Sequence, residues 1–312
     1  MTKISYVIPC FNSQNTIVSV VKSIKGMMKK DLKKYSYEII LVNDGSTLEL
    51  HSVITKNFYN DNYVRYIRLS KNFGQHNAIM AGLNSATGDY IVCLDDDGQT
   101  PASEIPILIN SLDEETDVVY GKYNLKKHSM FRNFGSYMND LMLRLLLGKP
   151  KDLYISSFFA MKKYVKDEII KYTSPYPYLG GLILKNTNRI KNIIVNHNAR
   201  IEGKSGYSLK KLIKLYMNGL TNFSIQPLRI SVYFSGLFIF IALITSIYLI
   251  VHKLSNPNIP IGWTSIIICI LFVGAVITFL LGLIGEYIGR IYISLNKIPQ
   301  YVEIKEEESE KN

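Results

Sequence analysis

Residues 90–101 read YIVCLDDDGQTP, an apolar run of strand length that leads directly into three carboxylates. Similar β-rich runs recur through the N-terminal part of the chain and alternate with helical patterns. The predicted strands cover residues 5–9, 37–42, 64–69, 90–94 and 117–120, and the predicted helices cover residues 16–28, 48–58, 77–85 and 103–112. Strands that alternate with crossover helices of this length predict an α/β fold with a mostly parallel sheet covered by helices.

Polar residues follow three of these predicted strands. Cys10 to Asn12 come after the first, Asn43 to Ser46 after the second, and Asp95 to Asp97 after the fourth. Sheets of this kind bind ligands at the carboxyl ends of their strands. Carboxylates two residues apart can share a hard divalent ion that also contacts substrate phosphates. A lone D-x-D also fits a solvated acidic turn, but its place after a buried strand, matched by Asp44, favours a metal site.

Several common sites are excluded. No G-x-G-x-x-G follows the first predicted strand, so a nicotinamide or flavin fingerprint is absent. Gly203 to Ser205 resemble the end of a P-loop, but Asn198 stands where its first glycine should be. The three cysteines, Cys10, Cys93 and Cys269, have no C-x-x-C spacing, which argues against a disulfide framework, a thiolate zinc site and a redox pair.

Two long apolar stretches lie near the C-terminus. Residues 230–251 carry no charged side chain, and residues 263–285 are almost entirely apolar. Each stretch is long enough to cross the hydrocarbon core of a bilayer. We therefore expect transmembrane helices over residues 229–252 and 263–288, joined as a hairpin by a short linker with two prolines. The alternative, two buried helices of a large soluble core, would normally keep a polar stripe.

Charge predicts the orientation of this hairpin. The formal net charge of +11 favours an anionic partner, and basic residues gather before the first stretch and after the second. The linker between them offers only Lys253. The positive-inside rule then places residues 1–207 and the tail 289–312 in the cytoplasm. The Lys- and Ile-rich composition favours a bacterial origin, so the expected location is the bacterial plasma membrane. Residues 303–310 are expected to form a solvated acidic tail.

Residues 208–228 form the expected juxtamembrane segment. Leu209, Leu212 and Ile213 recur at helical spacing, and lysines lie on the other side. This pattern is typical of an amphipathic helix in the interface of an anionic membrane, although a helix packed on its own domain has the same pattern. Nucleic-acid binding would explain the basic charge but not the apolar stretches, and no recognition motif is present. Gly282, Gly285 and other small residues permit close packing between spans or between protomers of a homo-oligomer.

Four ordered motifs carry a family resemblance. They are residues 6–12 (YVIPCFN), 41–46 (LVNDGS), 71–77 (KNFGQHN) and 81–89 (AGLNSATGD), and all precede the D-x-D segment. Together they resemble inverting family 2 glycosyltransferases, whose GT-A (Rossmann-like) fold has helices on both faces of its sheet. Arg132, residues 196–207, the basic helix and the two apolar stretches resemble the narrower subgroup of undecaprenyl- and dolichyl-phosphate glycosyltransferases.

The resemblance implies a donor site at the strand ends. Pro9, Asn12, Asp44 and Gly45 would line the nucleotide pocket, with Asp44 accepting a hydrogen bond from a ring N–H. The expected donor is a nucleotide-diphosphate sugar, with UDP favoured over GDP.

The resemblance also implies residues for the diphosphate and the acceptor. Asp95 and Asp97 would hold Mg²⁺ or Mn²⁺ against the diphosphate, and Gln99 would lie beside the sugar or the metal. The cationic groups expected to bind phosphate oxygens are those of Arg132, Arg200 and Lys204. A surface ion pair is the alternative for either arginine, and a solvated loop is the alternative for Lys204.

Departures from the family pattern affect the acceptor side. Ser13 replaces a common glutamate, and the usual paired aspartates of the second motif read Asn43-Asp44. The lipid-phosphate subgroup often carries an Asp and an Arg in a Gly-Asp-Phe-Arg-like segment, and the corresponding stretch here is Ser156 to Phe159. The base and its arginine partner are then missing, unless Asp152 substitutes.

The expected function is transfer of a sugar from a nucleotide-diphosphate sugar to polyprenyl phosphate, for cell-surface glycan synthesis. A phosphate monoester is largely ionised at neutral pH and hardly needs a general base. The alternatives are a glycosyltransferase that uses a lipid or glycan hydroxyl and a catalytically silent membrane scaffold. A processive polysaccharide synthase is disfavoured because the only tryptophan, Trp263, lies in the second apolar stretch rather than in a Q-x-x-R-W motif.

Overall fold

The computed structural model describes residues 1–123, 140, 143–144, 148–196, 262–296 and 298–304, together with isolated positions between 233 and 255. The chain divides into two compact units. The first contains residues 1–216 and 297–312, and the second contains residues 217–296.

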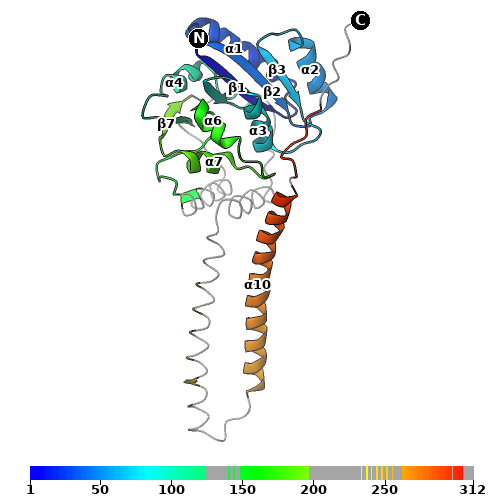
Figure 1. Cartoon of the computed structure of the whole chain (residues 1–312), viewed down its shortest axis with the longest axis vertical. Coiled ribbons are helices and arrows are strands. Elements are labelled where there is room, and N and C mark those ends of the chain that lie inside the picture. The colour runs from blue at the N-terminus through cyan, green and yellow to red at the C-terminus, as the bar shows by residue number, and fades with distance from the viewer. Residues whose placement is uncertain are drawn as a thin grey trace. The chain divides into compact units, whose positions relative to one another are not determined.

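A seven-stranded sheet organises the first unit, in the order β3-β2-β1-β4-β6-β5-β7 (Figure 1). All strand pairs are parallel except those that involve β6, which runs antiparallel to both β4 and β5. The strands are β1 (Lys3–Cys10), β2 (Ser36–Asn43), β3 (Val64–Arg68), β4 (Tyr90–Cys93), β5 (Val118–Tyr123), β6 (Phe159–Lys162) and β7 (Ile190–Val195). The predicted mostly parallel sheet is confirmed.

Helices cover both faces of this sheet. They are α1 (Ile17–Asp31), α2 (Leu48–Phe58), α3 (Gln75–Ser85), the 3₁₀ turn η1 (Ala102–Glu104), α4 (Ile105–Ile109), α6 (Lys163–Ile169) and α7 (Leu179–Asn186). Tyr6 and Ile8 of β1 share one buried core with α1, α2 and α4. Val7 points to the opposite face, where a Cβ on Gly82 of α3 would lie 2.4 Å from its Cγ1. Because both faces are buried, β1 and β2 read as continuous apolar runs.

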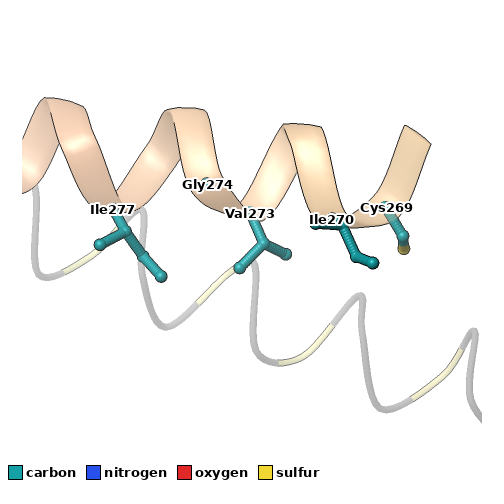
Figure 2. Close-up of a pocket in the computed structure, with 5 residues that line it drawn as sticks. All are labelled: Cys269, Ile270, Val273, Gly274 and Ile277. Carbon is teal, nitrogen blue, oxygen red and sulfur yellow. The ribbon is translucent and has the colours of Figure 1, made fainter. Parts of the chain in front are cut away.

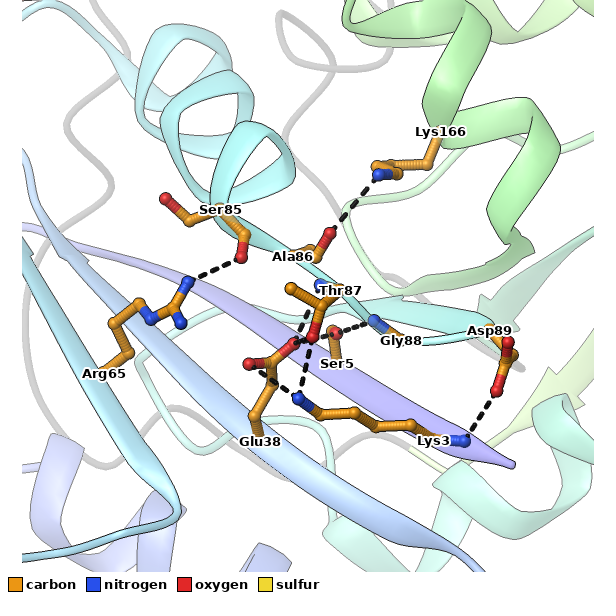
Figure 3. Close-up of polar contacts among 10 residues, drawn as sticks. All are labelled: Lys3, Ser5, Glu38, Arg65, Ser85, Ala86, Thr87, Gly88, Asp89 and Lys166. Atoms are coloured by element: carbon orange, nitrogen blue, oxygen red, sulfur yellow. Dashed lines mark hydrogen bonds and ion pairs between the residues drawn. The ribbon is translucent and has the colours of Figure 1, made fainter. Parts of the chain in front are cut away.

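A polar cluster closes the amino ends of three neighbouring strands (Figure 3). Glu38 of β2 accepts hydrogen bonds from the Ser5 hydroxyl (2.6 Å) and from the backbone N–H of Thr87 (2.9 Å), and Lys3 pairs with its other oxygen at 3.1 Å. Ser5 in turn accepts from the N–H of Gly88 at 2.8 Å. The cluster therefore ties β1 and β2 to the turn before β4, at the edge opposite the carboxyl ends of these strands.

The chain returns to the first unit after residue 297. Residues 298–304 contain a bridge between Glu303 and Leu69, the residue that follows β3. The sequence predicted a solvated tail from residue 303. The side chains of Glu303 and Ile304 are exposed, as expected, but the pairing of their backbone with the sheet was not predicted. Their backbone extends the sheet edge, because the exposed N–H and C=O groups of an edge strand readily pair with another extended segment. Residues 305–312 lie outside the described part of the chain.

In the second unit, α10 (Trp263–Leu295) is a continuous helix that extends beyond the predicted end at residue 288. Its window Phe272–Gly289 has a mean hydropathy of 1.9 and is unburied, and α10 is the one helix among the described residues that is long and apolar enough to cross a membrane. Figure 2 shows Ile270, Val273 and Ile277 projecting from the same side of this helix, along an apolar groove. The described positions between residues 233 and 255 are helical as well.

Candidate active site

The Asp95–Asp97 segment begins where β4 ends, at the carboxyl edge of the parallel strands. Asp97 accepts a hydrogen bond from the backbone N–H of Gln99 at 3.0 Å, which closes a tight turn. Gly98 lies at the centre of this turn with a φ of 69°, in the left-handed region that favours glycine. The D-D-D-G-Q sequence therefore favours this turn, which keeps Asp97 near the end of β4.

Asp95 is held by two neutral donors from distant parts of the chain. Gln75 Nε2, at the start of α3, donates to Oδ1 at 2.8 Å, and Ser157 Oγ, in the loop before β6, donates to Oδ2 at 2.5 Å. Burial, together with the charges of Asp97 and Asp96, raises the pKa of Asp95 to about 6, although the hydrogen bonds from Ser157 and Gln75 oppose that rise. The orientation of this carboxylate is thus fixed on both sides.

Asp96 has a different role from its neighbours. Its Oδ2 accepts from the N–H of Phe11 at 3.0 Å, and its carbonyl accepts from the Thr16 hydroxyl at 2.6 Å. These bonds fasten the loop after β1 to the loop after β4. The side chain of Asp96 therefore has a structural role, because it holds two loops together. Asp95 and Asp97 are the D-x-D pair.

Asp44, at the end of β2, organises the loop before α3. It is 3% exposed, and its two oxygens accept from the N–H groups of Phe73 (2.7 Å) and Gly74 (2.9 Å). Burial raises the pKa of Asp44 despite these hydrogen bonds. The next residue, Gly45, has a φ of 65°, and a Cβ there would lie 2.2 Å from the backbone carbon of Lys71. The sequence therefore needs glycine at this contact.

The loop after β1 completes the frame. Asn12 has a φ of 54°, which asparagine tolerates better than most residues, and its N–H donates to Ser46 Oγ at 3.0 Å. Pro9 is buried at the end of β1. Hydrogen bonds thus connect the loops after β1, β2 and β4 and the start of α3 into one network around the strand ends.

The donor set suits a hard divalent cation shared with a diphosphate. Three consecutive carboxylates follow β4, and the raised pKa of Asp95 reflects burial first and then the charges of Asp97 and Asp96. Among the residues that the structure describes, no three His, Cys, Asp or Glu side chains are arranged to hold a metal. Asp95 and Asp97 could therefore supply two carboxylate ligands, and substrate oxygens would have to complete the coordination shell.

The structure brings together most of the residues predicted for the donor side. Pro9, Asn12, Asp44, Gly45, Asp95, Asp97 and Gln99 all lie at the carboxyl edge of β1, β2 and β4. Arg132, Arg200 and Lys204 lie outside the described residues, so their predicted roles stay predictions. Asp152 is exposed. Gln75 and Ser157 were not predicted, although Gln75 falls within the 71–77 motif.

Comparison with known proteins agrees with this geometry. Residues 5–170 match the model of glycosyl transferase family 2, and residues 226–291 match the model of the GtrB C-terminal hairpin. A transferase of Yersinia pestis (strain Pestoides F), named undecaprenyl-phosphate 4-deoxy-4-formamido-L-arabinose transferase, is 32% identical over 303 residues, which cover 96% of this chain and 92% of that protein. The chain belongs to glycosyl transferase family 2.

Other relatives of this family 2 glycosyltransferase include an uncharacterized glycosyltransferase of Bacillus subtilis (strain 168). It is 32% identical over 305 residues, which cover 96% of this chain and 92% of that one. Among solved structures, glucosyl-3-phosphoglycerate synthase from Mycobacterium tuberculosis, in complex with Mn²⁺, UDP-glucose and phosphoglyceric acid, has a TM-score of 0.54 and 18% identity. The match covers 71% of this chain and 79% of the synthase, and it shows the same α/β fold.

Proposed function

We propose that this glycosyltransferase moves a sugar from a nucleotide-diphosphate sugar to undecaprenyl phosphate at the cytosolic face of the membrane, with inversion and with a divalent metal. The observation that carries the proposal is the Asp95 and Asp97 pair at the carboxyl edge of a parallel sheet, fixed by Gln75, Ser157 and the neighbouring loops. The Yersinia pestis relative is named for transfer to undecaprenyl phosphate and aligns over 96% of this chain, which supports this acceptor.

The nucleotide sugar is proposed to bind at the residues that follow β1, β2 and β4. Asp95 and Asp97 would hold Mg²⁺ or Mn²⁺, which supplies positive charge for the diphosphate leaving group. Pro9, Asn12 and the Asp44–Gly45 turn would line the nucleotide. Both oxygens of Asp44 already accept backbone hydrogen bonds, so recognition of a base N–H would use their remaining lone pairs. A UDP-sugar is the favoured donor, and the Mn²⁺ and UDP-glucose complex of the structural relative is in keeping with it.

The acceptor side needs little acid–base chemistry. A phosphate monoester with a second pKa of about 6 is largely dianionic at neutral pH, so its oxygen attacks the anomeric carbon without losing a proton. As that bond forms, the bond from the anomeric carbon to the diphosphate breaks, and the nucleoside diphosphate leaves with the electron pair. This explains how Ser157 can stand in the segment where related enzymes often carry an acidic residue. Arg132, Arg200 and Lys204 are proposed to bind the phosphate oxygens.

The second unit is proposed to anchor the enzyme as a two-span hairpin. The apolar window of α10 and the match of residues 226–291 to the hairpin family model support this anchor. With both chain ends in the cytoplasm, the donor site would work on the side of the membrane where nucleotide sugars are made. Close packing at the glycines of α10 would allow a homo-oligomer.

Transfer of labelled sugar into solvent-extractable lipid tests this function. Membranes that contain the full chain would receive a panel of UDP- and GDP-sugars with undecaprenyl phosphate, undecaprenol or diacylglycerol, each with Mg²⁺, Mn²⁺ or EDTA. We expect an acid-labile lipid product with the phosphate acceptor only, lost with EDTA and in Asp97→Asn. Product with an alcohol acceptor would replace the proposal with hydroxyl transfer, and nucleotide binding without any product would indicate a silent relative.

A further inference from the structure

Residues 298–304, called here the C-terminal strap, are bound to the first unit at two places. The first is the edge of the sheet. The N–H of Ser70 donates to the carbonyl of Val302 at 2.9 Å, and the N–H of Ile304 donates to the carbonyl of Arg68 at 2.8 Å. These two bonds flank the Leu69 and Glu303 bridge, so the strap continues the sheet beyond the end of β3.

The second place is the segment between α6 and α7. Gln300 is 8% exposed, and its side-chain Nε2 donates to the carbonyls of Tyr172 (2.7 Å) and Ser174 (2.8 Å). The side-chain amide of Gln300 therefore donates to two backbone carbonyls, both in a segment that is neither helix nor strand. Loss of this donor would leave two carbonyls without this partner. That loss destabilises the fold by more than the loss of a solvent-exposed hydrogen bond does.

These two contacts border the loop that builds the donor site. Ser70 immediately precedes residues 71–75, called here the donor loop, which includes the N–H groups of Phe73 and Gly74 that bind Asp44 and the Gln75 amide that binds Asp95. The strap therefore holds the residue just before this loop, and Asp44 holds the loop itself at Phe73 and Gly74.

The segment held by Gln300 reaches the other end of the donor loop. Ser174 precedes Pro175, whose carbonyl accepts from Asn77 Nδ2 at 3.2 Å. The ring of Tyr178 contacts His76 edge-on, with 5.5 Å between the ring centroids. The strap therefore reaches both sides of the donor loop, through Ser70 on one side and through residues 172–178 on the other.

We propose that the C-terminal strap is a positioning element of the donor site, and that nucleotide-sugar affinity depends on its docking. With the strap detached, the donor loop would lose support at both ends, and Asp44 and Asp95 would lose their fixed partners for part of the time. The identity of the ligand rests on the proposed function, whereas the contacts between the strap and the first unit are observed in the structure. Because α10 ends at Leu295, the chain runs from the proposed membrane anchor into this element within a few residues.

A matched pair of proline variants in the detergent-solubilised full chain tests the strap. Ile304→Pro removes the N–H that donates to Arg68, whereas the N–H of Glu303 makes no hydrogen bond within the described part of the chain, so Glu303→Pro is the control. Gln300→Ala removes the second contact. We expect Ile304→Pro and Gln300→Ala each to raise the Kd for the nucleoside diphosphate about tenfold. We also expect faster amide hydrogen exchange at Phe73 and Gly74, with Glu303→Pro like the wild type.

The proposal is overturned if the strap exchanges faster in the variants while the donor loop keeps its protection and the nucleotide Kd stays within twofold. If Ile304→Pro does not fold, Gln300→Ala tests the proposal through the hydrogen exchange of the donor loop and the nucleotide Kd. Neither readout needs an acceptor or product. A wild-type enzyme that transfers no sugar would therefore count against the proposed function, while the exchange of Phe73 and Gly74 would still decide about the strap.

Discussion

The orientation of the Asp95 carboxylate depends on two other side chains. Ser157 donates to one of its oxygens and Gln75 to the other. Ser157→Ala removes one donor and allows the carboxylate to rotate away from a metal. Groups that orient metal ligands typically contribute ten- to a hundredfold in metal affinity or activity. We expect the Mn²⁺ concentration for half-maximal transfer to rise about tenfold, measured by titration of activity with the metal.

Ser156→Ala is the matched control for this prediction. The Ser156 hydroxyl donates to the carbonyl of Phe158 at 2.8 Å and not to Asp95. The Mn²⁺ concentration for half-maximal transfer by Ser156→Ala is expected to stay at the wild-type value. A Ser157→Ala enzyme with an unchanged metal titration would show that the hydroxyl does not orient Asp95.

Gly45 offers a second prediction at the residue scale. A methyl group at this position meets the backbone of Lys71 at 2.2 Å, and the φ of 65° is unfavourable for alanine. Gly45→Ala should therefore displace the donor loop, lower the apparent Tm by about 5 °C and raise the nucleotide Kd by about tenfold or more.

Gly26→Ala gives the comparison for Gly45. Gly26 is exposed in α1 and has no atom within 4 Å of an added Cβ. Alanine is favoured over glycine in a helix by up to about 1 kcal/mol, so this variant should gain a few degrees in Tm and bind nucleotide normally. Equal behaviour of the two variants in thermal unfolding would contradict the assigned contact at Gly45.

Each predicted donor-side residue lies at the end of a strand or in the turn that directly follows it. Asp95 and Asp97 could be predicted because their spacing and their place after an apolar strand are local features. Gln75 and Ser157 could not, because their role depends on which distant side chains the folded sheet places near Asp95. The hydrogen bonds that Asp44 accepts from the donor loop arise from the same kind of tertiary contact.

At the scale of elements, the cluster around Glu38 gives a prediction with a definite sign. Burial raises the pKa of Glu38, but the hydrogen bonds from Ser5 and Thr87 and the pairing with Lys3 outweigh it and lower the pKa to about 2. A depressed carboxyl pKa stabilises the fold above the unfolded value of about 4.5, and this contribution is lost as pH falls toward 2.

Glu38→Gln tests that contribution. It should lower the apparent Tm at pH 7 by about 5 °C, corresponding to roughly 2 kcal/mol. The Tm difference from the wild type should shrink as pH falls from about 4.5 toward 2, because the carboxyl is protonated first in the unfolded chain and only near pH 2 in the folded protein. A Tm difference that is constant between pH 7 and pH 3 would contradict the cluster's role.

The elements that sequence patterns predicted share a clear apolar period. The predicted helix over residues 48–58 has the same limits as α2, and the five predicted strands are all present. The strand β6 was not predicted, because Phe159–Lys162 is short and joins the sheet antiparallel between β4 and β5. The strand β7 was not predicted either, because its half-exposed surface leaves no strong apolar run.

At the scale of the whole molecule, the proposed two-span topology makes a labelling prediction. In a Cys269→Ala background, Asn256→Cys in the linker between the spans should react with a membrane-impermeant maleimide on intact cells. Asp31→Cys, at an exposed position of the catalytic unit, should react only after permeabilisation. Cys10 and Cys93 are buried and should stay unreactive in the folded protein. Labelling of Asp31→Cys on intact cells would reverse the proposed orientation.

The central claim is that a lipid phosphate oxygen attacks the sugar and a nucleoside diphosphate leaves. The most direct test measures, in one reaction of the wild-type enzyme with its best donor and undecaprenyl phosphate, the nucleotide released and the phosphorus content of the lipid product. We predict one nucleoside diphosphate per lipid-linked sugar, and a product with a single phosphorus in a phosphodiester. Release of a nucleoside monophosphate, or a product with two phosphorus atoms per lipid, would contradict it.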